Sequence, residues 1–187
     1  MIMRKIIVSN FVSLDGYIAG PNGELDWHMV NKEFLDYAED MLNSVDTILF
    51  GRVTYEMMAD YWTKPEVKVN DPVIAGKMNG LPKIVFSKTL NKVDWENTTL
   101  VKDNIKETIL KLKQQPGKDI VILGSGTIVS AFTQMGIIDE YRIIINPVIL
   151  GAGKTQFSES LDKKILKLTD VQRFSSGVII LYYQPIQ

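Results

Sequence analysis

Two glycine-containing turns place the strongest constraint on how this chain can fold. Each turn leaves an apolar strand and opens a helix: residues 47–54 read Thr-Ile-Leu-Phe-Gly-Arg-Val-Thr, and residues 120–127 read Ile-Val-Ile-Leu-Gly-Ser-Gly-Thr. Strands that pass directly into helices are typical of a parallel sheet. Glycine allows close approach of the backbone, and the helix N-terminus that follows presents unpaired N–H groups with partial positive charge. Each turn is therefore a candidate anion site, and the pair favours a dinucleotide as the ligand.

Hydrophobic periodicity predicts an α/β fold with a mixed, mainly parallel central sheet. Strands alternate with helices as far as residue 136, and a terminal meander of three strands follows, which predicts antiparallel strands at one edge. The segment 13–27 contains several glycines and is predicted to be a long mobile loop. No linker interrupts the pattern, so residues 1–187 are expected to form one domain. The predicted strands are 2–12, 45–50, 83–87, 98–101, 119–123, 141–149, 166–174 and 177–183; the predicted helices are 31–44, one after residue 51, 73–78, one from 105 that ends before 116, and one that ends at 136.

Composition excludes several classes of function. The 21 basic and 22 acidic residues nearly cancel, and no basic stripe appears, which argues against nucleic acid as a partner. The chain has no cysteine and a single histidine, His28, so thiol chemistry and multi-histidine metal sites are excluded and no metal is expected. Neither a signal peptide nor a bilayer-spanning apolar run is present, and a cytoplasmic protein is expected.

In sheets of this kind, ligands bind outside the carboxyl ends of the strands, where the strand order reverses. Both glycine turns and the 13–27 loop leave strands at their carboxyl ends. The sequence therefore predicts that these three segments face a common cleft.

The turn 124–127 offers two glycines and two hydroxyl groups, from Ser125 and Thr127, at the start of a helix. This set suits a pyrophosphate. The sequence lacks the third glycine of the dinucleotide-binding fingerprint, however, and an ordinary tight turn with a Ser or Thr cap is the alternative.

The turn 51–54 carries the more specific signal. Thr54 can donate its hydroxyl and backbone N–H to a phosphate, and Arg52 supplies a planar, permanently charged fork. An arginine at this point favours the 2′-phosphate of NADP, and Ser87 and Lys88 follow another strand where they could close around the same group. The alternative for Arg52 is a surface ion pair.

Asp15 stands at the exit of the first strand, where a carboxylate can orient a substrate or hold a proton near a developing charge. The alternative is a turn in which Asp15 bonds only the local backbone. Trp27 is expected to close the 13–27 loop as a hydrophobic lid, and His28 is expected to be a surface histidine without an acid–base role.

The order of these elements resembles the dihydrofolate reductase fold, a three-layer arrangement with helices on both faces of the sheet. Two further stretches, 13–19 (Ser-Leu-Asp-Gly-Tyr-Ile-Ala) and 136–153 (from Gly-Ile-Ile-Asp-Glu-Tyr to Leu-Gly-Ala-Gly), are similar to the reductase domain of bacterial riboflavin biosynthesis. The resemblance covers nearly the whole chain. It implies an NADPH-dependent reduction of a small heterocyclic substrate (in that family a pyrimidine phosphoribosylamine), and a homodimer.

The resemblance also implies roles for particular residues. Gly51, Arg52 and Thr54 would hold the adenosine-side phosphates, with Ser87 and Lys88 adding to the 2′-phosphate site; Gly124, Ser125, Gly126 and Thr127 would take the pyrophosphate; and Asp15 would be catalytic, with Ile18, Trp27 and Glu33 at the substrate.

The chain departs from these families at two positions. Where dihydrofolate reductases carry a pterin-binding carboxylate, this sequence has Lys32, with Glu33 beside it, and Tyr17 replaces a lysine common in the riboflavin enzymes. Lys32 argues against folate activity, and both departures favour a non-catalytic nucleotide-binding protein. A true folate reductase and a non-catalytic nucleotide-binding protein stay open as the two alternatives.

Overall fold

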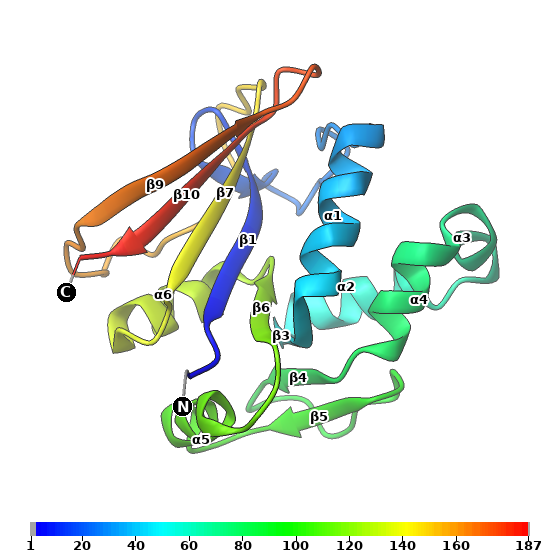
Figure 1. The fold of residues 1–187 in the computed structure, drawn as a ribbon, viewed down its shortest axis with the longest axis vertical. Coiled ribbons are helices and arrows are strands. Elements are labelled where there is room, and N and C mark those ends of the chain that lie inside the picture. The colour runs from blue at the N-terminus through cyan, green and yellow to red at the C-terminus, as the bar shows by residue number, and fades with distance from the viewer. Residues whose placement is uncertain (1–2, 187) are drawn as a thin grey trace.

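Runs of branched apolar residues form the centre of the sheet, as expected for strands that are covered on both faces. The computed structural model describes residues 3–186, in which one sheet has the strand order β5-β4-β3-β6-β1-β7-β10-β9 (Figure 1). The strands are β1 (Ile6–Ser13), β3 (Val45–Gly51), β4 (Lys83–Phe86), β5 (Thr98–Val101), β6 (Asp119–Leu123), β7 (Glu140–Asn146), β9 (Leu166–Arg173) and β10 (Ile179–Pro185).

The strand directions confirm the predicted fold class. The six strands from β5 to β7 are parallel, and β10 pairs antiparallel with both β7 and β9. The predicted terminal meander is wrong in one respect: β10, the last strand, lies between β7 and β9, so β9 forms the edge of the sheet.

Helices cover both faces of this sheet, which confirms the three-layer arrangement (Figure 1). One face packs against α1, α2 and α4, and the other packs against α5 and α6. Among the described residues, no helix is both long and apolar enough to cross a bilayer. The helices are α1 (Lys32–Ser44), α2 (Arg52–Trp62), α3 (Pro65–Asn70), α4 (Pro72–Gly80), α5 (Ile105–Gln114) and α6 (Gly126–Met135).

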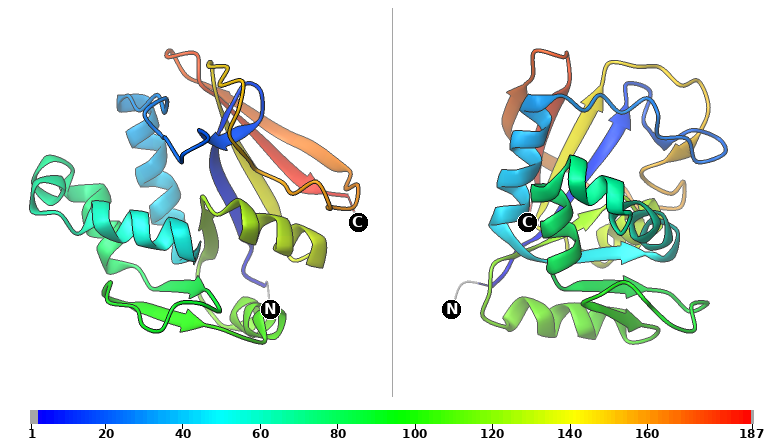
Figure 2. Two further views of the ribbon diagram at one scale, coloured as in Figure 1. Left: turned by 180° about the vertical axis from the view of Figure 1, so that it is seen from behind. Right: turned by 90° about the vertical axis from the view of Figure 1, so that its right-hand side faces the viewer.

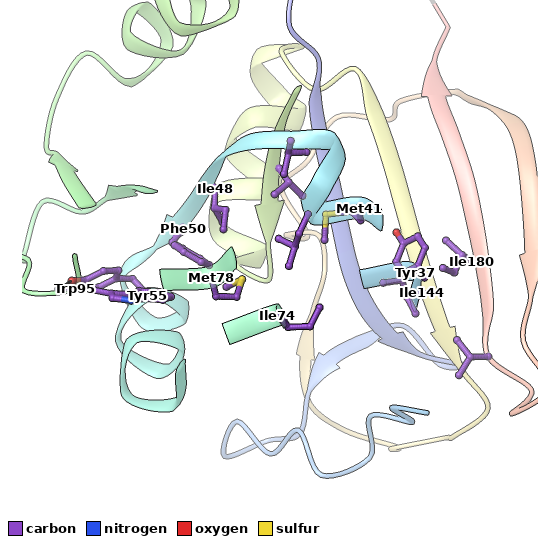
Figure 3. Close-up of a cluster of buried hydrophobic side chains, with 14 of the residues drawn as sticks. Tyr37, Met41, Ile48, Phe50, Tyr55, Ile74, Met78, Trp95, Ile144 and Ile180 are labelled. Carbon is purple, nitrogen blue, oxygen red and sulfur yellow. Dashed lines mark hydrogen bonds between the residues drawn. The ribbon is translucent and has the colours of Figure 1, made fainter. Parts of the chain in front are cut away.

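Alternation along the central strands divides the core into two layers. On β3, Ile48 and Phe50 face the α1–α2–α4 side, while Leu49 between them faces α5 and α6. Figure 3 shows the first layer, where Tyr37 and Met41 of α1 lie over the sheet. Helix α1 begins cleanly because its N-cap, Asn31, accepts a hydrogen bond from the backbone N–H of Phe34 at 3.0 Å.

Two predicted segments contain structure that the sequence did not indicate. The 13–27 segment is not wholly a loop, because β2 (Tyr17–Ala19) pairs antiparallel with β8 (Lys154–Thr155). Figure 2 shows the chain after β1 running beside the loop that carries β8. The predicted helix 73–78 is longer than expected, since α4 spans Pro72–Gly80, and a further helix, α3, precedes it. Pro65 and Pro72 are each the first residue of a helix, a position that proline favours.

Lys83 is buried and holds the end of α4. Its ammonium group donates hydrogen bonds to the carbonyl oxygens of Met78, Asn79 and Leu81 at 2.9, 3.0 and 2.7 Å, and it lies over the ring of Trp95. These carbonyls include helix-terminal groups that have no partner within the helix.

We therefore expect Lys83→Met to lower the free energy of unfolding by about 2–4 kcal/mol, because it leaves buried carbonyl oxygens without donors. Urea denaturation measures this loss. Lys68→Met, at an exposed position on α3, is the matched control and should change stability little. Equal effects of the two substitutions would contradict the role assigned to Lys83.

Candidate functional site

The parallel pairing of β3 with β6 brings the two glycine turns together at the carboxyl edge of the sheet. The backbone N–H of Gly51 donates to the hydroxyl of Ser125 at 2.7 Å, and the backbone N–H of Ser125 donates to the hydroxyl of Thr54 at 3.0 Å. Both hydroxyl oxygens act as acceptors in these bonds. Each group therefore keeps its own O–H proton for donation to a ligand.

The glycines of the second turn are required by the contacts between the turns. Gly124 has a φ of +64°, and a Cβ atom there would lie 2.8 Å from Cγ2 of Thr54. A Cβ atom on Gly126 would lie 2.9 Å from Cδ1 of Ile18. The alternative of an ordinary tight turn therefore explains these glycines in part, because packing against Thr54 and Ile18 is enough to exclude a side chain at either position.

Asn10 was missed by the sequence analysis, although its side chain holds the second turn in place by hydrogen bonds. Its side-chain amide donates to the carbonyl oxygen of Gly124 at 3.0 Å and accepts from the N–H of the same residue at 2.6 Å. It also donates to the side chain of Gln156 at 2.9 Å. The available signal was a polar residue within a strand that is otherwise buried, where an unpaired amide would be costly.

Helices α2 and α6 both begin at this junction without a side-chain cap. The N-cap of α2, Gly51, has no side chain, and the hydroxyl of the N-cap of α6, Ser125, accepts from the other turn and makes no capping hydrogen bond. The first-turn N–H groups of both helices therefore have no partner inside their helix and carry partial positive charge. Two adjacent helix N-termini of this kind fit the phosphate groups of a dinucleotide.

A cleft of about 1380 Å³ opens beside the two turns and extends between α1, α2 and the sheet. It reaches into the core layer of Figure 3, because Tyr37, Met41, Ile74 and Met78 belong both to that layer and to the cleft wall. Of the predicted site residues, six line the cleft: Ile18, Thr54, Gly124, Ser125, Gly126 and Thr127. The others lie outside its wall: Asp15, Trp27, Glu33, Gly51, Arg52, Ser87 and Lys88.

Asp15 is fully exposed and tied to a neighbouring loop. Its carboxylate accepts hydrogen bonds from the hydroxyl of Ser13 at 2.7 Å and from the N–H groups of Leu150 and Gly151 at 3.1 and 2.7 Å. The Ser13 hydroxyl and these N–H groups hold the pKa of Asp15 below its usual range. This placement argues against the predicted catalytic role and favours the alternative of a turn residue that bonds the backbone.

Glu33 likewise does not line the cleft. It accepts hydrogen bonds from the backbone N–H and the hydroxyl of Ser175, which lower the pKa of the carboxyl group. Its neighbour Lys32 forms an exposed ion pair with Asp36 at 2.8 Å. The geometry therefore does not support Glu33 as a substrate-binding group.

His28 lines the cleft, which corrects the expectation of a surface histidine. Its ring stacks on Phe11 with the centroids 4.1 Å apart and meets the edge of Trp27 at 4.4 Å. Trp27 itself lies outside the wall and donates its indole N–H to the carbonyl oxygen of Glu24. Burial lowers the pKa of His28 to about 4, and its Nε2 atom is buried with no partner among the described residues. His28 is therefore neutral at pH 7.

Arg52 forms the surface ion pair that was the alternative to phosphate binding. Its guanidinium bonds Glu56 at 2.9 Å, and both side chains are partly exposed. The register of β3 and β4 aligns Gly51 with Phe86, so Arg52 and Ser87 are the next residues along adjacent strands. Lys88 lines a separate, shallow depression.

With this geometry in view, the family can be assigned. Residues 4–180 match the model of the RibD C-terminal domain. The chain belongs to the RibD C-terminal domain family. The uncharacterized protein YyaP of Bacillus subtilis (strain 168) is 37% identical over 180 residues, which cover 96% of this chain and 94% of YyaP. The RibD C-terminal domain is a reductase domain, so the assignment supports an oxidoreductase at the family level.

Solved structures show the same fold at lower identity. A putative riboflavin biosynthesis protein from Shewanella sp. PV-4 is 24% identical, with a TM-score of 0.74 and coverage of 98% of this chain and 99% of that one. A Thermotoga maritima deaminase/5-amino-6-(5-phosphoribosylamino)uracil reductase has a TM-score of 0.70 at 17% identity, covering 98% of this chain and 57% of that protein. The dihydrofolate reductase of Enterococcus faecalis has a TM-score of 0.62 at 15% identity, covering 98% and 97%.

The depressed pKa of His28 predicts a specific loss of stability in acid. The unfolded chain binds a proton at His28 below pH 6.5, whereas the folded chain does so only near pH 4, so stability falls as the pH drops through this interval. Between pH 7 and 4.5 we expect the His28 contribution to fall by about 2 kcal/mol. Urea denaturation of the unaltered protein and of His28→Phe at both pH values separates this loss from the titration of carboxylates. Equal losses in the two proteins would contradict a buried, neutral His28.

Proposed function

We propose that this RibD C-terminal domain is an NADPH-dependent reductase that transfers hydride to a C=N or C=O carbon of a small heterocyclic substrate. The observation that carries the proposal is the junction of α2 and α6, where two uncapped helix N-termini meet at the edge of one cleft. The family assignment supports a reductase, and the junction supports a ligand with several phosphate groups.

Residues of the second turn would hold the pyrophosphate of NADPH. The N–H groups of Gly126 and Thr127 lie at the start of α6, and the hydroxyls of Ser125 and Thr54 retain protons for donation. Gly51 contributes indirectly, because its N–H orients the Ser125 hydroxyl. The helix dipoles add attraction for the phosphate charge.

Arg52, Ser87 and Lys88 would hold the 2′-phosphate. Arg52 directly follows β3 and Ser87 directly follows β4, with Lys88 next in the chain, and all three lie outside the main cleft. Arg52 would exchange its exposed partner Glu56 for the phosphate, which costs little because surface ion pairs are weak. A guanidinium then binds the dianion through two parallel hydrogen bonds.

When bound, NADPH supplies the hydride, and the protein supplies position and a dry environment. Ile18 lies against the α6 N-terminus, and the apolar side chains of α1 and α2 form the opposite wall and exclude water. No side chain of Asp15 or Glu33 lines this space in the described structure, so neither is assigned a part in the reaction. The absence of Glu33 from the wall also weakens the folate reductase alternative.

A homodimer is proposed as well, with β9 at the interface. This edge strand is largely exposed and carries apolar side chains, including Leu168 and Val171, on its surface. An uncovered edge strand of this kind favours pairing with another copy.

NADPH oxidation across a panel of imines, aldehydes and pterins tests the reaction. Oxidation of at least one imine or aldehyde supports a reductase, whereas oxidation of dihydropterins alone, blocked by an antifolate, supports a folate reductase. NADPH binding without oxidation of any compound supports the non-catalytic alternative and contradicts the proposal.

Arg52→Ala tests the cofactor preference. We expect it to weaken NADPH binding about tenfold or more while leaving NADH binding nearly unchanged, because only NADPH carries the 2′-phosphate. Fluorescence titration gives both dissociation constants. Lys64→Ala, which removes a similarly exposed cation paired with Asp60 beyond the other end of α2, is the matched control. An unchanged ratio of the two constants in Arg52→Ala would show that the 2′-phosphate assignment is wrong.

A further inference from the structure

The wall of the cleft changes character from one end to the other. The phosphate end is formed by Thr54 and residues 124–127, where backbone N–H and hydroxyl groups predominate. The opposite part, called here the apolar end, is formed by side chains of β1, α1 and α2: Phe11, Phe34, Ala38, Met41, Met58, Tyr61 and Trp62. Phe11 and Phe34 pack with their ring centroids 4.7 Å apart, so the apolar end begins with an aromatic surface.

Charged groups are scarce in this wall, and the acidic ones outnumber the basic ones. Among the residues that the structure describes, the acidic and basic side chains lining the cleft besides His28 are Asp26, Asp71 and Lys154. Asp71 is occupied as the N-cap of α4. Lys154 belongs to β8, and its charge acts on the carboxylate of Glu24, whose pKa it helps to lower.

A phosphorylated substrate would find no counter-charge at the apolar end. Recognition of a phosphate monoester normally uses arginine or lysine; no arginine lines this cleft in the described structure, and its lysine, Lys154, lies on β8 rather than at the apolar end. Arg142 lies behind the wall, where it is paired with Glu140 at 2.7 Å. The carboxylates of Asp26 and Asp71 would repel a second dianion in the cleft.

His28 adds a polar ring to this part of the wall. It stacks on Phe11 and lines the cleft, while its Nε2 atom is buried without a hydrogen-bond partner among the described residues. A buried polar atom without a partner is costly, and a polar group of a ligand can remove that cost. A neutral imidazole suits a hydroxyl, carbonyl or ring nitrogen better than it suits an anion.

We propose that the apolar end binds an uncharged, flat aromatic ring, with one polar substituent hydrogen-bonded to His28, and that it discriminates against phosphorylated substrates. This inference rests on the proposed function, because it assigns the substrate half of the same cleft. It separates this chain from the phosphoribosylamine substrate that the family resemblance implies. The matching surfaces are the rings of Phe11 and His28 and the side chains of Met41 and Met58.

The test compares 1-naphthol with 1-naphthyl phosphate, two probes that share a ring and differ by the phosphate. Isothermal titration calorimetry is carried out on the full chain, both alone and saturated with NADP⁺. We expect the NADP⁺-saturated chain, whose phosphate end is occupied, to bind 1-naphthol at least about tenfold more tightly than 1-naphthyl phosphate. Equal or tighter binding of 1-naphthyl phosphate to the saturated chain, or no binding of 1-naphthol up to its solubility limit, would overturn the inference.

Two variants test the charge and the polar contact separately. Leu35→Arg places a cation in the cleft wall and should improve binding of 1-naphthyl phosphate about fivefold or more, while Leu110→Arg, at a similarly exposed position outside the cleft, should not. His28→Phe keeps the stacked ring and should weaken 1-naphthol about fivefold without affecting naphthalene. If neither variant changes binding in this way, the probes bind elsewhere and the inference fails.

Binding of the cofactor is measured separately from binding of the naphthyl probes. NADPH titration without a probe tests the proposed function alone. Tight NADPH binding with no preference between the naphthyl probes overturns the substrate inference and leaves the reductase proposal standing. A preference for 1-naphthol without any NADPH binding supports the substrate inference and overturns the proposal of an NADPH-dependent reductase.

Discussion

The two hydrogen bonds between the glycine turns are the interaction on which the site depends. They run in opposite directions: Gly51 donates to Ser125, and the backbone of Ser125 donates to Thr54. The hydroxyl of Ser125, the N-cap residue of α6, and the hydroxyl of Thr54, in the first turn of α2, each hold the other turn. The helix N-termini are therefore left open toward the cleft, and their spacing is fixed by the sheet rather than by a flexible loop.

The rest of the fold supports this junction. Parallel pairing of β3, β6 and β1 brings three strand ends to one edge, and Asn10 bonds both backbone groups of Gly124 from the adjacent strand. On the other side of the cleft, α1 and α2 contribute apolar side chains and no carboxylate within the described wall. One end of the cleft thus carries backbone N–H and hydroxyl groups and the other carries apolar side chains, a contrast that is consistent with the proposed phosphorylated cofactor and uncharged substrate ring.

The sequence was sufficient to predict the sheet and the meeting of the two glycine turns, because both depend on local patterns. Strand-length apolar runs and turn glycines identify β3 and β6, and parallel pairing then requires their ends to meet. The surroundings of Asp15, Glu33 and His28 depend on contacts between distant segments of the chain, which no local pattern reveals. Asp15 and Glu33 bond Gly151 and Ser175, which are more than 100 residues away in the chain. The burial of His28 likewise follows from its stacking on Phe11 in another element.

Short elements were missed for a related reason. Strand β2 has three residues and β8 has two, so neither shows an alternation that a sequence pattern can detect. Their pairing becomes evident only when the long chain segment after β7 is folded back over the α6 N-terminus, where the carbonyl oxygen of Thr155 lies 3.0 Å from the position of a Cβ atom on Gly126.

The most direct test of the account is whether both turns grip one ligand. In an amide nitrogen–proton NMR titration with NADPH, the signals of Val53 and Thr54 in the first turn and of Gly126 and Thr127 in the second should shift together and give a single dissociation constant. Shifts confined to one turn, different constants for the two turns, or no shifts at millimolar NADPH would contradict it.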